Sequence, residues 1–444
     1  MDRAAHRLKT GRQPDDTDEG SAMTTGQDIE ELVRFVLAPG TSDDPFAHYL
    51  RLRELADVHR SERTGMTLLS RYADCRQVLG DPETFRVVDT DWMAAHRPGW
   101  RPSPSQEQFL SSLFFRNPPD HTRLRRQLSR GFTARRLRVL RPLVHQEVLR
   151  ALDRLAAVPP GEAADFQELV AVPLSLTVLG GLLGIPASDH PRCWTLLHEA
   201  VPAPDPAADE AARAALARRA DEAAAELAAY FTDLIARKRT EPGDDLVSAC
   251  LREQADDPEQ LTDHELALAV LPVFGAGVTT LSDTLGNIMH TLLAHPGRLE
   301  RLAADPAQAE RAAAEAFRYC GGYHITRRYA TRDTEIRGVP VEAGSVLVLL
   351  LAGANRDPEA FGRPEEFDVE RPETASLAFG AGIHHCLGAA LAKLLVETVC
   401  GALHRAPALR PAGPPRWRPS LLFFGPVHLP VTVVAEPPTA RPAP

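Results

Sequence analysis

The sequence has few of the features that mark secreted, membrane-spanning or metal-clustering proteins. Its 444 residues include six cysteines without a Cys-x-x-Cys pair, which argues against structural zinc and against a secreted disulfide scaffold. The N-terminal stretch lacks the apolar segment of a signal peptide, and we find no apolar run approaching the ~18–20 residues of a spanning helix. A net charge of −10 disfavours a nucleic-acid-binding surface. These absences predict a cytoplasmic, acidic enzyme that binds neither membrane nor nucleic acid.

What is present is the composition of an ordinary globular protein, with 44% hydrophobic and 25% charged residues. Residues 1–28 are polar and are expected to be a disordered extension, in which Met23 is an alternative start. The proline-rich residues 436–444 are expected to form a loose tail. Residues 29–435 are predicted to form a single domain. Lysine is rare beside abundant arginine and alanine, a bias typical of GC-rich bacterial genomes.

The hydrophobic pattern predicts a mainly α chain with a small β region. Helices are predicted within 121–156, 207–239, 262–294 and 306–320 and directly after Cys386, and strands near 67–69 and within 324–352. The helix over 262–294 has Thr262 as its N-cap and ends before His295-Pro296. Residues 86–118 show no steady period, and we predict a long loop there, of the kind that often carries function.

The most specific local pattern is the segment FGAGIHHCLG, from Phe379 to Gly388. A cysteine stands at the predicted start of a helix, where backbone N–H groups lower the pKa of a thiol. Glycines let a backbone approach a flat partner closely, and the phenylalanine can shield the sulfur from water. A single cysteine with no second sulfur nearby suits one axial bond to a haem iron better than a zinc cage.

This segment resembles the haem-binding loop FGxGxHxCLG of cytochrome P450 monooxygenases, and it matches at every fixed position. The resemblance implies the P450 prism fold, haem b as cofactor, and Cys386 as the ligand of the iron. It also implies that His384 contacts a haem propionate and that Phe379 and Gly380 belong to the cofactor-binding loop. Gly388 would let the following helix pass close to the porphyrin.

Further motifs of the family lie at matching positions from about residue 45 to residue 431. Glu315 and Arg318 resemble its ExxR motif, whose spacing puts both side chains on one helix face. The resemblance implies that this pair joins Arg371 to lock the loop beneath the haem.

A second basic group matches the residues that bind the haem propionates in this family. His121 and Arg125 are four residues apart on one predicted helix face, and Arg328 follows in a predicted strand. Guanidinium and carboxylate form good bidentate pairs. Neighbouring arginines form either a solvated helix face or a proximal patch for an acidic ferredoxin: Arg123, Arg126, Arg130, Arg135 and Arg136.

The long helix carries AGVTT at residues 276–280, which resembles the (A/G)-G-x-(D/E)-T segment above the haem. In the favoured register Ala276 and Gly277 are the small pair, Thr279 stands at the acid position and Thr280 at the alcohol. The alternative register moves the acid position to the valine before Thr279. Neither register provides the carboxylate of the family, although a threonine hydroxyl can relay protons into a dioxygen pocket.

Family position also suggests substrate contacts from the 86–115 loop, the long helix, the segment after ExxR and the C-terminal region. Most of these side chains are apolar, which suits a hydrophobic pocket. The candidates are Trp92, Met93, Val273, Phe274, Ile325, Thr326, Leu422 and Phe423, with Trp100 in the same loop.

These features predict a bacterial P450 that uses dioxygen to hydroxylate or epoxidise a small to medium organic molecule, in secondary metabolism. With no flavin- or ferredoxin-like segment, the chain would take electrons from a separate ferredoxin and ferredoxin reductase, and we expect a monomer. The missing acid leaves open a P450 that couples or desaturates its substrate without inserting oxygen. A non-catalytic haem protein that assists a partner enzyme is a third hypothesis. The substrate could arrive free or tethered to a carrier protein.

Overall fold

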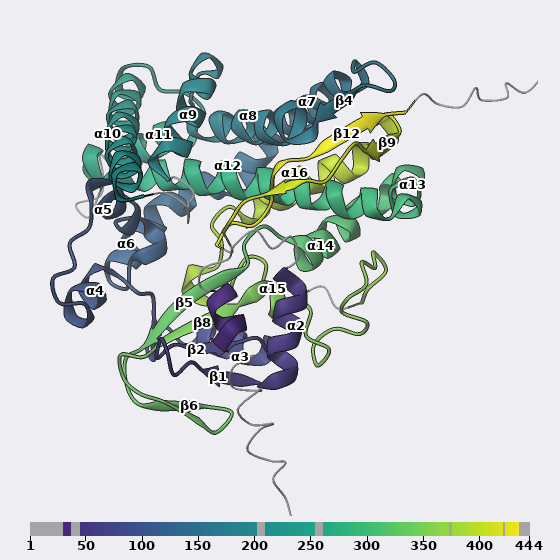
Figure 1. The fold of residues 1–444 in the computed structure, drawn as a ribbon. Helices are drawn as coiled ribbons and strands as arrows, with labels where there is room; N and C mark the ends of the chain where they lie inside the picture. Colours follow the sequence, from purple (N-terminus) through teal and green to yellow (C-terminus); the bar gives the residue numbers. More distant parts are fainter. Residues whose placement is uncertain are drawn as a thin grey trace, which may run out of the picture.

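The computed structural model describes residues 30–36, 45–201, 209–253, 261–372, 375–420 and 422–434. Within these residues the chain is mainly α with a small β region, as the sequence predicts. Figure 1 shows the helices gathered in the upper part of the molecule and a strand-rich region below them. The predicted extension at 1–28, the tail at 436–444 and the boundaries at 29 and 435 lie outside the described residues.

The helices follow the predicted segments, with boundaries set by local caps and prolines. Residues 30–36 are helical, and the labelled helices are α2 (Pro45–Leu55), α3 (Tyr72–Gly80), α4 (Thr90–His96), α5 (Pro104–Leu110), α6 (Asp120–Ser129), α7 (Ala134–Ala156), α8 (Val172–Leu183), α9 (His190–Ala200), α10 (Glu210–Thr240), α11 (Leu246–Glu253), α12 (Asp263–Ala294), α13 (Pro296–Ala304), α14 (Ala309–Cys320), α15 (Leu351–Ala354) and α16 (Ala389–Ala402).

The strands form one five-stranded sheet and three smaller groups. The sheet has the order β1 (Val58–Arg60), β2 (Thr67–Leu69), β8 (Val346–Leu350), β5 (Ile325–Ala330) and β3 (Phe85–Arg86). β2 and β8 are parallel, and the other pairs are antiparallel. The smaller groups are β4 (Ala163–Asp165) with β12 (Pro430–Val433) and β9 (Leu409–Pro411), β6 (Thr334–Ile336) with β7 (Val339–Val341), and β10 (Arg416–Trp417) with β11 (Pro426–His428).

β8 is buried on both faces, and each face packs against a different hydrophobic cluster. Side chains alternate across a strand, so Leu347 and Leu349 enter one hydrophobic cluster while Val348 and Leu350 enter another. This explains why the strand is a continuous apolar run rather than an alternating one.

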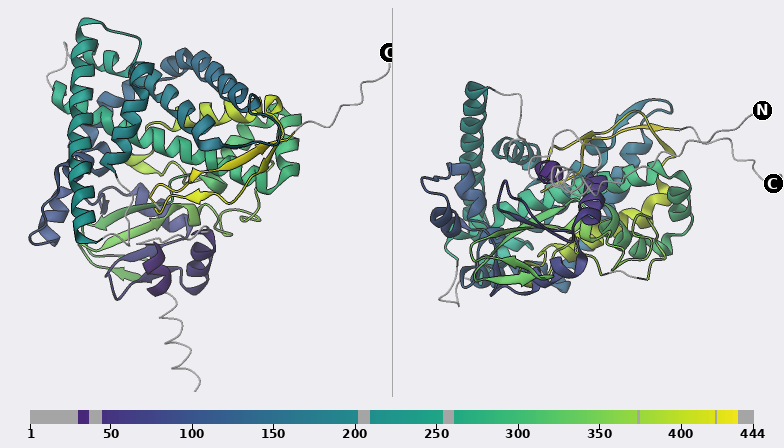
Figure 2. Two further views of the ribbon diagram at one scale, coloured as in Figure 1. Left: turned by 45° about the horizontal axis from the view of Figure 1, so that its top comes forward. Right: turned by 60° about the horizontal axis from the view of Figure 1, so that its bottom comes forward.

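α12 is the central helix of the larger hydrophobic cluster. A capping box begins it, because Thr262 Oγ1 accepts from the backbone N–H of Glu265 while Glu265 accepts from the N–H of Thr262. The helix packs against α8, α10 and α14, and Figure 2 shows it lying among them. It also meets the length and composition of a membrane-spanning segment, contrary to the sequence-based expectation, but 61% of its apolar window is buried inside the protein. Burial among other helices accounts for its apolar character.

Two predicted segments differ in detail from the structure. The helical stretch over 121–156 is divided into α6 and α7, because Thr133 accepts a hydrogen bond from Arg136 N and begins a new helix. The 86–118 segment contains the short helices α4 and α5, which begin at Asp89 and Ser103 as N-caps. Helices of seven residues are too short to show an apolar period.

The loop before α16 is held against the end of α3 by a close backbone contact. Gly382 has a φ of +67°, in the left-handed region, and a Cβ at this position would lie 2.0 Å from Leu79 O. Only glycine satisfies both conditions, which explains the second glycine of the FGAG sequence.

We therefore expect Gly382→Ala to destabilise this loop more than a matched glycine substitution elsewhere. Gly338 has a φ of +77° with nothing within 4 Å of its Cβ position, so Gly338→Ala adds backbone strain of about 1–2 kcal/mol alone. Gly382→Ala should cost about 1–3 kcal/mol more, because Leu79 must also move. Urea unfolding followed by circular dichroism measures both losses, and equal losses would contradict the packing argument.

Candidate functional site

Cys386 lies at the end of a tightly hydrogen-bonded loop. Its backbone N–H donates to Phe379 O at 2.8 Å, and α16 begins three residues later, at Ala389. Cys386 keeps some accessible surface, although protein atoms surround its sulfur closely, whereas the five other cysteines are buried. The Phe379 ring packs on Phe317 of α14, with ring centroids 4.6 Å apart.

The pKa of the Cys386 thiol is raised, which differs from the expectation of a lowered value. Burial is the main cause, because it removes water from the charged form. The backbone N–H groups of Gly388 and Ala389 and the charge of Arg125 act in the expected direction, but they are weaker than this effect. The loop alone therefore does not stabilise a thiolate, whereas a bound cation would remove the proton outright.

The predicted ion pair between Glu315 and Arg318 is present, and both side chains are buried. Arg318 donates Nε and Nη2 to the two carboxylate oxygens at 2.7 and 2.8 Å. Arg371 Nε donates to Glu315 Oε1 at 3.3 Å, and the backbone N–H of Asp368 donates to the same oxygen at 2.7 Å. Removing one partner of such a buried group typically costs about 3–5 kcal/mol.

This network continues into the cysteine loop through Asn355. Arg318 Nη1 donates to the carbonyl of Asn355 at 2.8 Å, and the Asn355 side chain accepts from Leu377 N at 2.6 Å. The carbonyl of Leu377 then accepts from Gly380 N at 2.9 Å. The loop that bears the thiol is thus tied to α14 by buried hydrogen bonds.

A second set of predicted residues forms a buried basic cluster. The rings of His121 and His384 lie 4.3 Å apart, and the charges of Arg125 and Arg328 act on both. Burial and these charges lower the pKa of His121 to about 4 and that of His384 to about 2, and burial lowers the pKa of Arg328 to about 10. Among the described residues no carboxylate pairs with Arg125 or Arg328, and His121 Nε2 is buried without a partner. This cluster suits an anionic group.

Comparison with known proteins decides the family. A model of the family described as Cytochrome P450 matches residues 213–405. Cytochrome P450 107B1 of Saccharopolyspora erythraea is 35% identical over 431 residues, which cover 92% of this chain and 99% of that protein. The chain belongs to the cytochrome P450 family.

Two further comparisons agree with this assignment. The 6-deoxyerythronolide B hydroxylase of Saccharopolyspora erythraea is 36% identical over 422 residues and covers 92% of this chain and 99% of its own. The crystal structure of CalO2 matches with a TM-score of 0.77 and 31% identity, covering 88% of this chain and 96% of that one. The fold is therefore the P450 fold that the sequence predicted.

Haem b is the cofactor of P450 proteins, and the residues of this P450 fit it. Cys386 supplies one sulfur ligand, and the basic cluster complements propionate carboxylates. A Cβ at Gly380 or Gly388 would meet no protein atom closer than 4.0 and 3.8 Å respectively. The φ of +66° at Gly380 by itself favours glycine there, whereas neither backbone conformation nor protein packing requires glycine at residue 388. A flat group lying close to the backbone would require it.

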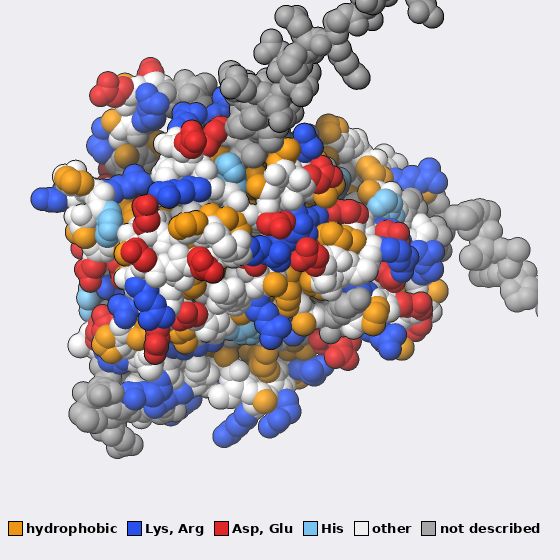
Figure 3. Space-filling view, turned by 90° about the horizontal axis from the view of Figure 1, so that it is seen from below, with side chains coloured by type: hydrophobic (Ala, Val, Ile, Leu, Met, Phe, Trp, Pro, Cys, Tyr) orange, Lys and Arg blue, Asp and Glu red, His pale blue; other side chains and the backbone are white. Residues whose placement is uncertain are grey.

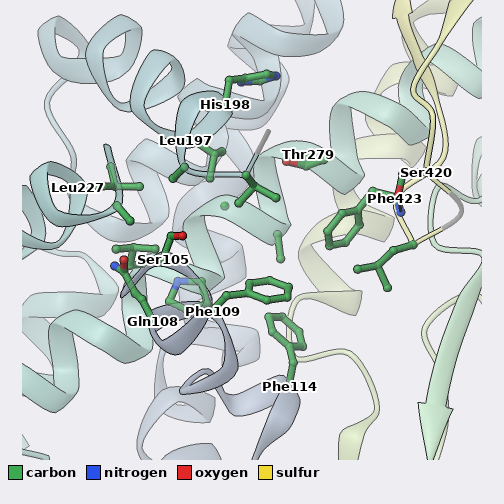
Figure 4. A pocket seen from close by; sticks show the side chains of 18 of the residues that line it. Ser105, Gln108, Phe109, Phe114, Leu197, His198, Leu227, Thr279, Ser420 and Phe423 are labelled. Atoms are coloured by element: carbon green, nitrogen blue, oxygen red, sulfur yellow. Dashed lines mark hydrogen bonds between the residues drawn. The ribbon is translucent and has the colours of Figure 1, made fainter. Parts of the chain in front are cut away.

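A cavity of about 260 Å³ lies beside α12. Figure 4 shows Phe109 and Phe114 projecting toward it on one side and Phe423 on another. It is lined by Ser105, Gln108, Phe109, Phe114, Leu197, His198, Ala200, Val201, Ala224, Leu227, Leu271, Pro272, Gly275, Ala276, Thr279, Arg418, Ser420, Leu422 and Phe423. The ring of Tyr323 lies 6.2 Å from that of Phe423, one of the lining residues.

Of the predicted pocket residues, Leu422 and Phe423 line this cavity. The 86–115 segment contributes as predicted, but through α5 and the residues after it. Trp92 instead stacks on His96 of its own helix at 4.6 Å, and Met93 is half-buried on that helix. The short helix α4 turns these two side chains away from the cavity lining.

The remaining predicted pocket residues also lie outside the lining. Phe274 is fully buried against Phe231 of α10, and Val273 packs on the same core. Ile325 is buried in the cluster beside the sheet, and Thr326 accepts a hydrogen bond from Arg328 Nη1 at 3.1 Å. Sequence reasoning named no residue of α9 or α10, although both helices line the cavity, because no local motif reveals how they pack.

On α12, Ala276 and Thr279 line the cavity, while Val278 is fully buried in the core. Of the two candidates for the acid position, Thr279 therefore faces the cavity and Val278 does not. Gly277 lies elsewhere, because a Cβ there would approach Leu179 of α8 to 2.8 Å, so this glycine permits close helix packing. Thr280 Oγ1 donates to Ala276 O at 2.8 Å.

We expect Cys386→Ala to abolish the haem–thiolate absorption spectrum and, with it, oxygenase activity. The matched control is Cys193→Ala, in α9, because Cys193 is fully buried in the hydrophobic core. The control should lose stability through a small cavity but keep the spectrum. Optical spectra of the reduced, carbon monoxide-treated proteins make the comparison, and a thiolate band in Cys386→Ala would refute the ligand assignment.

Proposed function

We propose that this P450 is a monooxygenase that hydroxylates or epoxidises a small to medium organic molecule of bacterial secondary metabolism. It would work in the cytoplasm, as a monomer, with electrons from a ferredoxin and ferredoxin reductase. The observation that carries the proposal is the Cys386 loop beside a buried basic cluster. The names of relatives such as 6-deoxyerythronolide B hydroxylase support the reaction class.

In this proposal the chain holds haem b from two sides. The sulfur of Cys386 would bind the iron, and His121, Arg125, Arg328 and His384 would face the propionates. Haem held by a thiolate supplies the activation of dioxygen. The Glu315 network keeps the loop in place, and the apolar cavity walls exclude water from the substrate.

The two threonines of α12 would handle protons in place of the missing acid. The Thr280 hydroxyl donates a hydrogen bond to Ala276 O. The lone pairs of the hydroxyl oxygen therefore remain available to accept a hydrogen bond from a second group. Thr279 lines the cavity where the family has a carboxylate, and its hydroxyl can donate or accept but carries no charge. A water molecule held by these hydroxyls could complete the proton path.

The ferredoxin would dock on the arginine-rich surface of α6 and α7. Two of its arginines are already paired, Arg123 with Glu265 at 2.5 Å and Arg136 with Asp244 at 3.0 Å, whereas Arg135 is exposed. The face in Figure 3 carries both basic and acidic side chains. An acidic protein is drawn to a local basic patch even when the net charge is negative.

The absent carboxylate also favours a second candidate, oxidative coupling or desaturation without oxygen insertion. Such a reaction removes electrons and protons from the substrate and leaves both oxygen atoms as water. A threonine at residue 279 would then indicate that this reaction takes up protons differently from hydroxylation.

Turnover under labelled dioxygen tests the reaction class. Compounds that shift the spectrum of the ferric protein to high spin are incubated with NAD(P)H, ferredoxin and ferredoxin reductase. We expect mass spectrometry to find one labelled oxygen atom in the product. Parallel reactions in labelled water control for exchange, and an oxidised product without label would replace the monooxygenase proposal with coupling or desaturation.

We expect Thr280→Ala to release more hydrogen peroxide per NAD(P)H consumed than the native enzyme. Loss of the hydroxyl removes a proton relay, an effect typically of about 10²–10⁴-fold on proton-transfer steps. Ser282→Ala is the control, since its hydroxyl bonds to Thr279 O on the same helix but outside the cavity lining. Peroxide and product are measured together, and unchanged coupling in Thr280→Ala would assign the relay to Thr279 or to water.

A further inference from the structure

Arg418 is a basic residue in the lining of an otherwise largely apolar cavity. It follows β10 directly, and its backbone N–H donates to Gly425 O at 3.0 Å, which fixes the hairpin formed by β10 and β11. Its side chain is 18% exposed and donates Nη2 to Asp283 Oδ1 of α12 at 3.1 Å. The guanidinium is therefore held between the long helix and the cavity.

Asp283 is a buried residue of α12 that holds Arg418 in place through an ion pair. Its side chain is 1% exposed, and a Cβ at Gly425 would lie 2.5 Å from the Cβ of Asp283. The C-terminal hairpin can reach α12 here only because residue 425 is glycine. A buried carboxylate requires a partner of opposite charge, and Arg418 is the one that the structure provides.

The guanidinium nevertheless has donors to spare. Nε of Arg418 is buried without a hydrogen-bond partner, and no acceptor for Nη1 occurs among the described residues. A guanidinium has five N–H donors, and Asp283 accepts only one hydrogen bond from it. Oδ2 of Asp283 is also buried without a partner, so a closer pairing of the two side chains can satisfy one of these donors. The Nη1 donors then remain for an acceptor on the molecule that occupies the cavity, because buried donors are normally satisfied.

The rest of the lining favours an anion as that acceptor. None of the lining residues is Asp or Glu. His198 also lines the cavity, and the charge of Arg418 contributes, after burial, to lowering its pKa. Gln108 presents a buried Nε2 donor without a partner, and Figure 4 shows this residue well away from Ser420 and Phe423. The cavity thus offers unsatisfied donors but no acidic group.

We propose that Arg418 is a specificity residue that binds a carboxylate of the substrate, and that Asp283 is its positioning residue. The planar fork of guanidinium matches a carboxylate, and the walls formed by Phe109, Phe114 and Phe423 accept an apolar body. The substrate class is then an organic acid that enters with its carboxylate free. This inference rests on the proposed function, because it assigns the cavity to the substrate of the haem enzyme.

The test measures binding to the ferric holoenzyme by absorption spectroscopy, without turnover. The probes are imidazol-1-yl-hexanoic, -octanoic, -decanoic and -dodecanoic acids and their primary amides, in which the imidazole binds iron and the chain carries the other group into the cavity. We expect one chain length at which the acid binds about tenfold more tightly than its amide, the order of a hydrogen bond to a charged group. Equal affinities at every length would overturn the proposal.

Variants then assign this preference to Arg418. In Arg418→Gln/Asp283→Asn, which removes both buried charges together, the acid-to-amide ratio should fall from about ten to about one. Arg418→Lys keeps the pairing with Asp283 and should give a smaller but remaining preference, since an ammonium keeps the charge and loses the fork. Arg416→Gln, an exposed arginine on the same hairpin, is the control and should keep the native ratio. A native ratio in Arg418→Lys and in the double variant would overturn the proposal.

The same experiment separates failure of this inference from failure of the proposed function. The thiolate spectrum of the native protein is recorded before any probe is added. If that spectrum is absent, the haem–thiolate assignment fails first and the carboxylate site loses its basis with it. If the spectrum is intact and acids bind no better than amides, only the role of Arg418 is overturned.

Discussion

The buried carboxylate of Glu315 is the contact on which the organisation of the site depends. It accepts hydrogen bonds from Arg318, Arg371 and the backbone of Asp368, and so gathers a segment that has no regular secondary structure. Arg318 carries the same constraint onward to Asn355, whose side chain holds the start of the cysteine loop. A loop rich in glycine cannot fix itself, because glycine has the largest backbone freedom to lose. The buried charges supply that order from outside the loop.

The site of this P450 is basic, although the molecule as a whole carries a negative charge. The chain has a net charge of −10, yet four basic groups converge beside Cys386 without a carboxylate among the described residues. Burial makes that arrangement unfavourable, as the lowered pKa values of His121 and His384 show. An anionic cofactor would therefore stabilise this cluster by neutralising its positive charge. Arg418 differs from these four residues, because Asp283 already neutralises its charge. Nε of Arg418 still has no hydrogen-bond partner.

α12 brings these two regions together. Its glycines at 275 and 277 allow α9 and α8 to approach closely, while Ala276 and Thr279 face the cavity. Farther along, Asp283 receives the C-terminal hairpin through the contact with Gly425. α12 thus carries the hydroxyls of Thr279 and Thr280 and, about one turn later, the carboxylate of Asp283 that holds Arg418.

The sequence alone determined the family, the mainly α fold, the cysteine of the site and the ExxR pair, because these depend on local spacing. Helix caps such as Thr262 and the glycine pattern around Cys386 operate over a few residues and can be read directly. The cavity could be predicted only in part, since α9, α10 and the C-terminal hairpin meet through packing between distant segments. The net pKa of Cys386 and the use of Arg418 also required the tertiary structure, because burial and the neighbouring groups decide both. Local chemistry therefore identified the kind of site, and long-range packing decided which side chains the substrate meets.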